Sequence, residues 1–316
     1  MLQCPLAIQE ILKQNFNKTI ESTNLPYNKV NVGKVRDIYE VNNDLLLVST
    51  DRLSAFDRHL CTIPFKGKVL TALSAWWFAK TKHIIANHFI SLPHPNCMQV
   101  KKCKVLPIEV VVRGYLTGST NTSIWCLYQQ GQRKFADITL PDNLHKNMPL
   151  PQLIITPTTK DAVHDAPITE AEIVKTIMSK SQWKFIKTKA LELFSFSQSL
   201  ADKSGLILVD TKYEFGIDDK GNIILIDECH TADSSRYWLR ESYTPENHNE
   251  EPQSFDKEIM RLWYKKNSNP YEDKILPEAP QEKRIQLAYS YIKLYELLTN
   301  NTFDFTIKKL TELVLQ

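Results

Sequence analysis

Two stretches of the sequence decide how the chain folds, LILVDTKYEFG (residues 206–216) and NIILIDE (residues 222–228). Each contains four consecutive aliphatic residues, which is typical of a strand buried on both faces. The residues between them include Gly221, which suits a turn that needs a positive φ angle. The two stretches therefore predict a buried β-hairpin whose strands end in charged residues.

The register of this hairpin determines which charged side chains meet. With a two-residue loop at residues 220–221, Glu214 faces Asp227. Lys212 then lies two positions along on the same face. A lysine and two carboxylates suit a Mg²⁺ ion and the phosphates of a nucleotide. A register shift of one residue would bring Glu228 into the place of Asp227. A hairpin tip whose charges are simply solvated is the alternative interpretation.

The composition indicates an ordinary soluble protein rather than one that binds nucleic acid or spans a membrane. A formal net charge of +3 gives no surface suited to a polyanion. No apolar run approaches the roughly 18 residues of a membrane span, and the N-terminal residues do not resemble a secretory signal. The six cysteines contain no CxxC pair, which fits reduced thiols. We expect a cytoplasmic location.

The first third of the chain is rich in strand patterns. Residues 25–50 alternate as short strands and turns, and a polar loop is expected at residues 51–57. A helix with an apolar face is expected from Val69 to Ile84. Strands are expected again over residues 100–105 and 108–112.

The remaining chain is more helical. Residues 114–159 are rich in Pro, Thr and Asn, and only residues 123–130 look helical there. Thr169 offers a helix N-cap, and Gly205 offers the end of the next helix. Further helices are expected over residues 256–264, 281–298 and 306–315. We therefore expect two lobes, an N-terminal strand-rich lobe (residues 1–115) and a larger lobe of mixed helices and strands (residues 116–316).

Four further segments place charged side chains beside glycines or hydroxyls: residues 33–37, 49–57, 108–119 and 231–238. Such segments suit phosphates and carboxylates, which arginine holds through two parallel hydrogen bonds. Each also has a simpler interpretation as a turn, a helix cap or an internal salt bridge between Glu109 and Arg113. The anion-binding groups outnumber what one triphosphate requires, which predicts a second, phosphorylated substrate. These groups are Lys34, Arg113, Ser119, Lys212 and Arg236.

The motifs occur together, in order, over residues 25–240, and the chain resembles the SAICAR synthetase family. The motifs are GKVRD (33–37), STDR (49–52), SAFD (54–57), VVRGYLTGS (111–119), DTK (210–212), EFG (214–216) and DSSR (233–236). The resemblance implies an α+β fold, with a kinase-like antiparallel N-terminal lobe and an ATP-grasp-like second lobe that clamp a nucleotide between them.

The resemblance also implies the reaction. ATP and Mg²⁺ are the implied cofactors. The carboxylate of carboxyaminoimidazole ribonucleotide (CAIR) is joined to the amine of L-aspartate, which gives the succinocarboxamide product (SAICAR), ADP and phosphate in de novo purine (IMP) biosynthesis. An acyl phosphate is the expected intermediate of this reaction. The expected assembly is a monomer or a homodimer, with no nucleic acid and no membrane as partner.

The matching positions imply a role for each candidate residue. The ATP site is formed by Gly33, Lys34, Arg36, Lys212 and Glu214, and the metal ligands are Asp227 and Glu214. The substrates are held by Ser54, Asp57, Arg113, Ser119, Lys160, Asp165, Asp233, Ser234 and Arg236. The catalytic residues are Lys212, Asp227 and Arg113.

Two other classes of protein share some of these features. A kinase would share the nucleotide and the metal, but the chain has no Gly-x-Gly-x-x-Gly loop and no His-Arg-Asp segment. A non-catalytic nucleotide-binding module would be expected to lack Glu214 and Asp227. The chain departs from the family pattern at Cys229-His230 and at Ala232, where the family commonly has non-ionisable residues and a proline. We interpret His230 as a structural residue.

Overall fold

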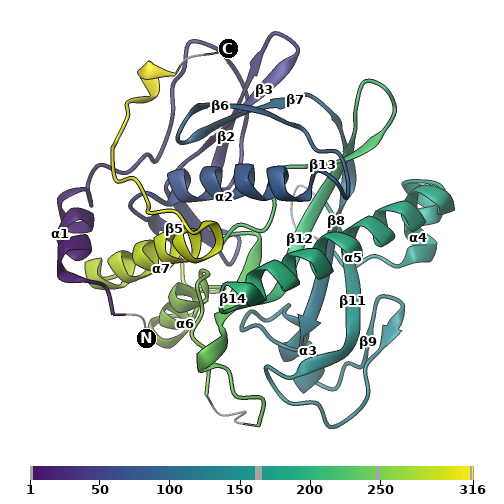
Figure 1. The fold of residues 1–316 in the computed structure, drawn as a ribbon. Helices are drawn as coiled ribbons and strands as arrows, with labels where there is room; N and C mark the ends of the chain where they lie inside the picture. The colour runs from purple at the N-terminus through teal and green to yellow at the C-terminus, as the bar shows by residue number, and fades with distance from the viewer. Residues whose placement is uncertain (1–2, 161–165, 247–249, 314, 316) are drawn as a thin grey trace.

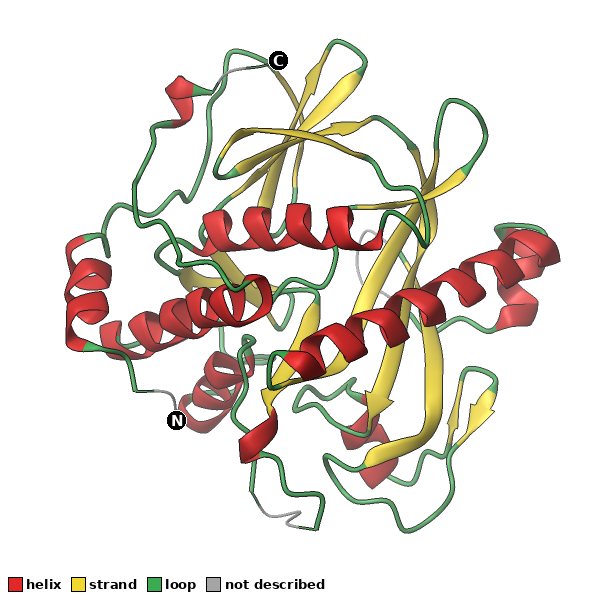
Figure 2. Ribbon diagram, viewed as in Figure 1, coloured by secondary structure: helices red, strands yellow, loops and turns green. Residues whose placement is uncertain are grey.

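The computed structural model describes residues 3–160, 166–246, 250–313 and 315 of the chain (Figure 1). The described part contains two five-stranded antiparallel sheets with helices packed against them, so the predicted α+β fold class is confirmed (Figure 2). Within these ranges no helix is both long enough and apolar enough to cross a membrane.

The first sheet lies in the N-terminal part of the chain. Its strand order is β1 (Asn28–Val32), β2 (Arg36–Val41), β3 (Asp44–Ser49), β7 (Cys97–Lys101) and β6 (Phe89–His94). Helix α2 (Lys66–Thr81) packs against it through Val69, Leu70 and Leu73, which are fully buried. The helix therefore follows its predicted apolar face but ends at Thr81, three residues before its predicted end.

The second sheet is built around the hairpin that the sequence predicts. Its strand order is β11 (Pro149–Thr159), β8 (Lys104–Tyr115), β12 (Leu206–Ile217) and β13 (Ile223–Ile226), and β14 (Ser235–Leu239) also pairs with β12. Helix α5 (Lys180–Lys203) covers this sheet, as Figure 1 shows. The four residues Leu206–Val209 are all buried. Helix α5 covers one face of this strand, and other parts of the chain cover the opposite face.

The remaining elements surround these two sheets. They are α1 (Leu6–Gln14), β4 (Arg52–Ala55), β5 (Arg58–Thr62), α3 (Ile124–Gln129), β9 (Lys134–Phe135), β10 (Ile138–Thr139), α4 (Glu170–Thr176), η1 (Arg240–Ser242), α6 (Glu258–Asn267), α7 (Gln281–Thr299) and η2 (Leu310–Glu312). Helix α7 packs against α1, α2 and α6, so the C-terminal helix contacts elements of both halves of the chain.

The predicted helix boundaries near residue 170 are confirmed. Thr169 caps α4 and forms a capping box with Glu172, in which each side chain accepts a hydrogen bond from the other residue's backbone. Gly205 follows α5 with φ +71°, a conformation that a residue with a Cβ adopts only under strain.

The predicted register of the β12–β13 hairpin is wrong by one residue. Glu214 pairs with Ile226 rather than with Asp227. The loop spans residues 218–222, because the Asp218 carboxylate accepts hydrogen bonds from the backbone N–H groups of Lys220 and Asn222 at 3.0 and 2.7 Å. This side-chain cap stabilises a longer turn than the two-residue loop that the glycine suggests.

Three other local predictions are corrected. The expected polar loop at residues 51–57 contains β4, whose Arg52 is buried because it pairs with Asp37 at 2.8 Å. The Pro-rich region contains β11, which tolerates proline because it is an edge strand. The expected helix over residues 306–315 is a single short 3₁₀ turn, and Leu310, Leu313 and Leu315 pack against the first sheet instead.

The two halves of the chain share one large apolar core. That core contains residues of α2, such as Val69, and residues of α5, such as Trp183. Strand β8, which lies before residue 115, belongs to the second sheet. The lobe boundary at residues 115–116 stays a prediction.

Candidate active site

Two adjoining cavities lie against the second sheet, and one of them is also bordered by residues of β1 and β2 in the first sheet. Cavity A has a volume of about 460 Å³, and cavity B has a volume of about 320 Å³. The two cavities share a wall formed by Glu109, Lys212, Asp233, Ser234, Lys257 and Arg261. A molecule in either cavity can therefore approach a molecule in the other.

Most residues predicted for the site line one of these cavities. Cavity A is lined by Gly33, Lys34, Arg36, Ser54, Asp57, Lys160, Lys212, Glu214, Asp227, Asp233 and Ser234. Cavity B is lined by Arg113, Lys212, Asp233, Ser234 and Arg236. Ser119 is buried beside Thr120, which lines cavity B. Asp165 lies outside the described residues.

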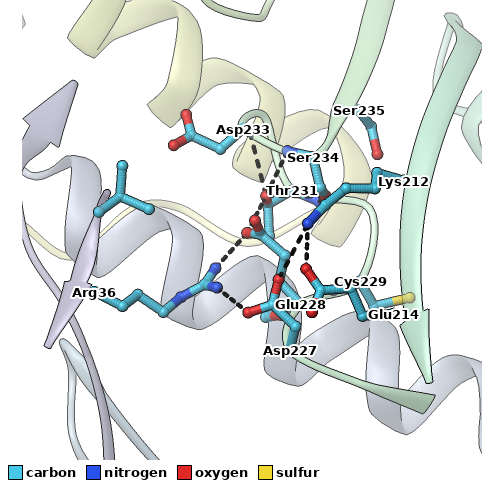
Figure 3. Close-up of polar contacts among 12 residues, drawn as sticks. Arg36, Lys212, Glu214, Asp227, Glu228, Cys229, Thr231, Asp233, Ser234 and Ser235 are labelled. Atoms are coloured by element: carbon cyan, nitrogen blue, oxygen red, sulfur yellow. Dashed lines mark hydrogen bonds and ion pairs between the residues drawn. The ribbon is translucent and has the colours of Figure 1, made fainter. Parts of the chain in front are cut away.

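Lys212 is the centre of the charge network in cavity A. Its Nζ atom lies 2.8 Å from Glu109. It also lies 3.8 Å from Asp227 and contacts Glu214 (Figure 3). Burial alone would lower the pKa of Lys212, but the nearby carboxylates outweigh this effect and raise the pKa above its ordinary value. Lys212 is therefore a permanent cation.

Asp227 reaches this network although the hairpin register differs from the prediction. Strand β13 ends at Ile226, and Asp227 turns the chain with φ +64°. Its carboxylate accepts a hydrogen bond from Arg36 at 2.5 Å, and the same guanidinium contacts Glu228 at 2.5 Å. Burial would raise the pKa of Asp227, but Arg36 and Lys212 hold that pKa well below its ordinary value. The convergence of Lys212, Glu214 and Asp227 is thus confirmed by a different geometry.

Cavity B has two arginines facing one carboxylate. Asp210 lies beside Arg113 and Arg236 in the register of the three neighbouring strands. Its Oδ2 atom is 3.6 Å from Arg113 and also contacts Arg236. The internal Glu109–Arg113 pair does not form, because both side chains find their partners on β12. The Nε atom of Arg236 is buried and has no hydrogen-bond partner among the described residues.

Two residues of the shared wall were missed by sequence analysis. Lys257 precedes α6, and Arg261 lies four residues later on the same face of that helix. The spacing is visible in the sequence, but nothing in it indicates that this helix reaches the cavities. Burial lowers the pKa of Lys257 to about 8, so this lysine titrates near neutral pH.

His230 is buried outside the two cavities, in agreement with its structural interpretation. Its Nε2 atom lies 2.9 Å from the Tyr213 hydroxyl, and its ring centre lies 4.8 Å from that of Trp77. Burial lowers the pKa of His230 to about 3, which keeps the ring neutral. The histidine therefore fills core space.

Known proteins with similar sequences share one activity in their names. Residues 29–277 match the family model described as SAICAR synthetase. The Legionella pneumophila (strain Lens) phosphoribosylaminoimidazole-succinocarboxamide synthase is 50% identical over 288 residues, which cover 90% of this chain and 92% of that protein. The chloroplastic Arabidopsis thaliana protein of that name is 51% identical over 300 residues, which cover 93% and 73% of the two proteins.

Solved structures agree with this result. The structure titled SAICAR-synthase from Saccharomyces cerevisiae complexed SAICAR has a TM-score of 0.77 and 33% identity, and the match covers 90% of this chain and 99% of that chain. A type-2 SAICAR synthetase in complex with ADP has a TM-score of 0.65 and 26% identity, over 87% and 99%. The sequence motifs, the two-lobed fold and these matches agree, and the chain belongs to the SAICAR synthetase family.

Proposed function

We propose that cavity A binds ATP and cavity B binds CAIR, so that the reacting groups meet at the shared wall. As a member of the SAICAR synthetase family, the chain uses ATP to join the carboxylate of CAIR to the amine of L-aspartate in purine biosynthesis. The observation that carries this division is the shared wall, because ligation requires two bound molecules within reach of the same side chains.

Cavity B fits the phosphate of CAIR. Arg113 and Arg236 supply planar guanidinium groups, and a single aspartate, Asp210, faces both. Arg113 also donates to Thr156 at 2.8 Å, and the charges of Glu258 and Asp256 act on Arg236. Two guanidinium groups have ten N–H donors between them, so a phosphate can take the hydrogen bonds that these acceptors leave. Ser119, which is buried next to this cavity, completes the proposed phosphate site.

Cavity A fits the triphosphate of ATP. Gly33 and Lys34 form the turn between β1 and β2, and Lys34 pairs with Asp57 at 2.6 Å. Both side chains are more than half exposed, so this pair can separate at little free-energy cost when a phosphate approaches. Arg36 is buried and holds the Asp227 carboxylate in place through an ion pair.

The donor set in cavity A is suitable for Mg²⁺. The described residues contain no cluster of three or more His, Cys, Asp or Glu side chains that could hold a metal. Mg²⁺ commonly binds one or two carboxylates together with phosphate oxygens, so such a cluster is not required. We assign the ion to Asp227, whose side chain is 26% exposed, and to Glu214 beside it. A bound Mg²⁺ would neutralise phosphate charge at this position.

The shared wall would then stabilise the reaction. In the first step of the proposed reaction, a carboxylate oxygen of CAIR bonds to the γ-phosphorus of ATP as ADP leaves. In the second step, the amine nitrogen of aspartate bonds to the resulting acyl carbon as phosphate leaves. The amine gives up a proton in the second step. Lys212 lies between both cavities as a permanent cation, so it stabilises negative charge on the transferred group.

L-Aspartate is the substrate whose site is least defined by the motifs. Its two carboxylates require cations near the shared wall. Lys257 and Arg261 lie in that wall, and Lys160 lines cavity A while contacting Glu214. We assign aspartate to these three side chains.

The cytoplasmic location and the monomer or homodimer state remain part of this proposal. The six cysteines are all unpaired in the structure, as expected for a reducing compartment. Cell fractionation and the mass of the purified protein in solution test these two points.

The test of the proposed function is phosphate release from ATP and Mg²⁺ by the purified protein. CAIR and L-aspartate are omitted one at a time and then supplied together. Release that requires both supports coupled ligation, and release with CAIR alone supports the acyl phosphate. The absence of release in the complete mixture would reject the proposed division of the cavities.

A further inference from the structure

A fully buried lysine and a fully buried tyrosine hold Asp233 at the shared wall. Lys66, the first residue of α2, places its Nζ atom 2.7 Å from Oδ2 of Asp233. The hydroxyl of Tyr291, on α7, donates to Oδ1 at 2.8 Å. Lys66 and Tyr291 are both fully buried, and the Asp233 side chain is only 4% exposed.

The partners keep Asp233 ionised. Burial would raise the pKa of this carboxyl, but Lys66 and Lys257 oppose burial and hold the pKa well below its ordinary value. A buried carboxylate with a lysine and a hydroxyl on its two oxygens is fixed in position, because moving it would leave a charge without a partner.

Asp233 belongs to a tightly bonded loop between β13 and β14. The Thr231 hydroxyl accepts hydrogen bonds from the backbone N–H groups of Asp233 and Ser234, both at 3.2 Å, and donates to Glu228 at 2.6 Å (Figure 3). The Ser234 carbonyl accepts from the Lys212 N–H at 2.9 Å. Two residues further on, Arg236 enters cavity B.

We infer that Lys66 and Tyr291 are positioning residues that fix the 231–236 loop through Asp233. They lie on α2 and α7, which pack against each other behind the loop. Through the loop they determine where Ser234 and Arg236 meet the substrate. The C-terminal helix α7 thus contributes to substrate binding without lining either cavity among the described residues. This inference rests on the proposed function of cavity B.

Tyr291→Phe tests the inference, because it removes one hydroxyl and keeps the ring in the core. We expect the KM for CAIR to rise by about 5-fold with kcat unchanged, since one hydrogen bond to a charged group is lost. Backbone amides of residues 231–236 should exchange hydrogen faster. Tyr289→Phe is the matched control, because Tyr289 is a buried tyrosine of the same helix that interacts with Cys4 and Glu296 instead.

A double-mutant cycle separates positioning from general stability. In an Asp233→Ala background, Tyr291→Phe should change the KM for CAIR by less than about 2-fold, because the acceptor oxygens of the partner side chain are already lost. A full additional effect in that background would overturn the inference, and so would a KM within 2-fold of wild type in the single variant.

A failure of the proposed function can be distinguished from a failure of the anchoring by Lys66 and Tyr291. Wild-type protein without turnover in the complete mixture rejects the assignment of cavity B. The exchange of the loop amides still tests the anchoring in that case. Exchange that is equal in Tyr291→Phe and Tyr289→Phe overturns the anchoring itself.

Discussion

Cavity A and cavity B are built on the same sheet, yet their charges are arranged differently. In cavity A, carboxylates and cations alternate, with Arg36 and Lys212 each between two or more acids. In cavity B, Arg113 and Arg236 share one aspartate. An alternating network accepts a phosphate chain together with its cation, whereas unsatisfied guanidinium groups accept a phosphate alone. The two proposed sites therefore differ mainly in how their acidic and basic side chains are balanced, and less in the fold that supports them.

Asp227→Asn tests the proposed role of cavity A and has the largest expected effect. We expect kcat to fall by at least about 1,000-fold, because the variant loses one of the two carboxylates proposed to hold Mg²⁺ in cavity A. Asn also tolerates the positive φ angle at this position, so the fold should persist. Phosphate release in the complete mixture and circular dichroism measure the two effects.

Asp219→Asn is the control for this variant, since Asp219 is an exposed acid in the loop of the same hairpin. Its turnover should match wild type. Near-normal turnover of Asp227→Asn would reject the metal assignment.

Arg236→Ala addresses cavity B. We expect the KM for CAIR to rise by about 100-fold with a small change in kcat, because a phosphate-holding arginine binds ground and transition states alike. Initial rates over a range of CAIR concentrations measure this. Arg240→Ala is the control, because Arg240 is about half exposed and pairs with Asp202 on the surface. A large fall in kcat at unchanged KM would contradict the comparison, since it would give Arg236 a role in the chemical step.

Lys34→Ala makes a smaller change in cavity A. We expect the KM for ATP to rise by about 5-fold, because the lysine is exposed and its charge is screened by solvent. Lys102→Ala is the matched control, an exposed lysine of the N-terminal part that pairs with Glu40. A rise confined to the KM for CAIR would show that this turn serves the other substrate.

The smallest expected effect concerns pH and Asp256 in cavity B. Burial, followed by the charge of Glu258, raises the pKa of Asp256 to about 6. The carboxyl is neutral below this pH and repels the CAIR phosphate above it. The KM for CAIR should therefore rise by about 3-fold from pH 5 to pH 7 in wild type relative to Asp256→Asn. Parallel pH profiles for the two proteins would contradict this prediction.

The same group affects stability in a defined direction. Because the folded pKa of Asp256 lies above its ordinary value, the folded state binds more protons between the two values. The contribution of this group to the free energy of unfolding is therefore fully present at pH values below both pKa values. It decreases as the pH rises through about 6. The Asp256→Asn variant should lack this dependence in thermal unfolding.

Local patterns predicted the elements that depend on neighbouring residues. The strands of the β12–β13 hairpin, the Thr169 cap and the turn at Gly205 are confirmed, because aliphatic runs, capping hydroxyls and glycine act over a few positions. The predicted hairpin register was wrong, because the loop depends on backbone hydrogen bonds that the Asp218 carboxylate accepts. Strand β11 was missed, because its prolines are tolerated only at a sheet edge.

The candidate site shows the same division. The charged strand ends and arginine motifs were visible in the sequence, and the structure gathers most of them around two cavities. The partner of Asp227 is Arg36, 191 positions away, and no local pattern links them. Lys257 precedes α6 and Arg261 lies on it, and the sequence does not indicate that this helix reaches the cavities.

The sequence by itself determined the chemistry available to this protein: which residues carry charge, which strands are buried and which family the motifs resemble. Only the tertiary structure decided how those charges are paired. The anchoring of Asp233 by Lys66 and Tyr291 joins three segments that are distant in the chain. Such pairs form because burying a charge is unfavourable without a partner, and the choice of partner follows from packing rather than from spacing in the sequence.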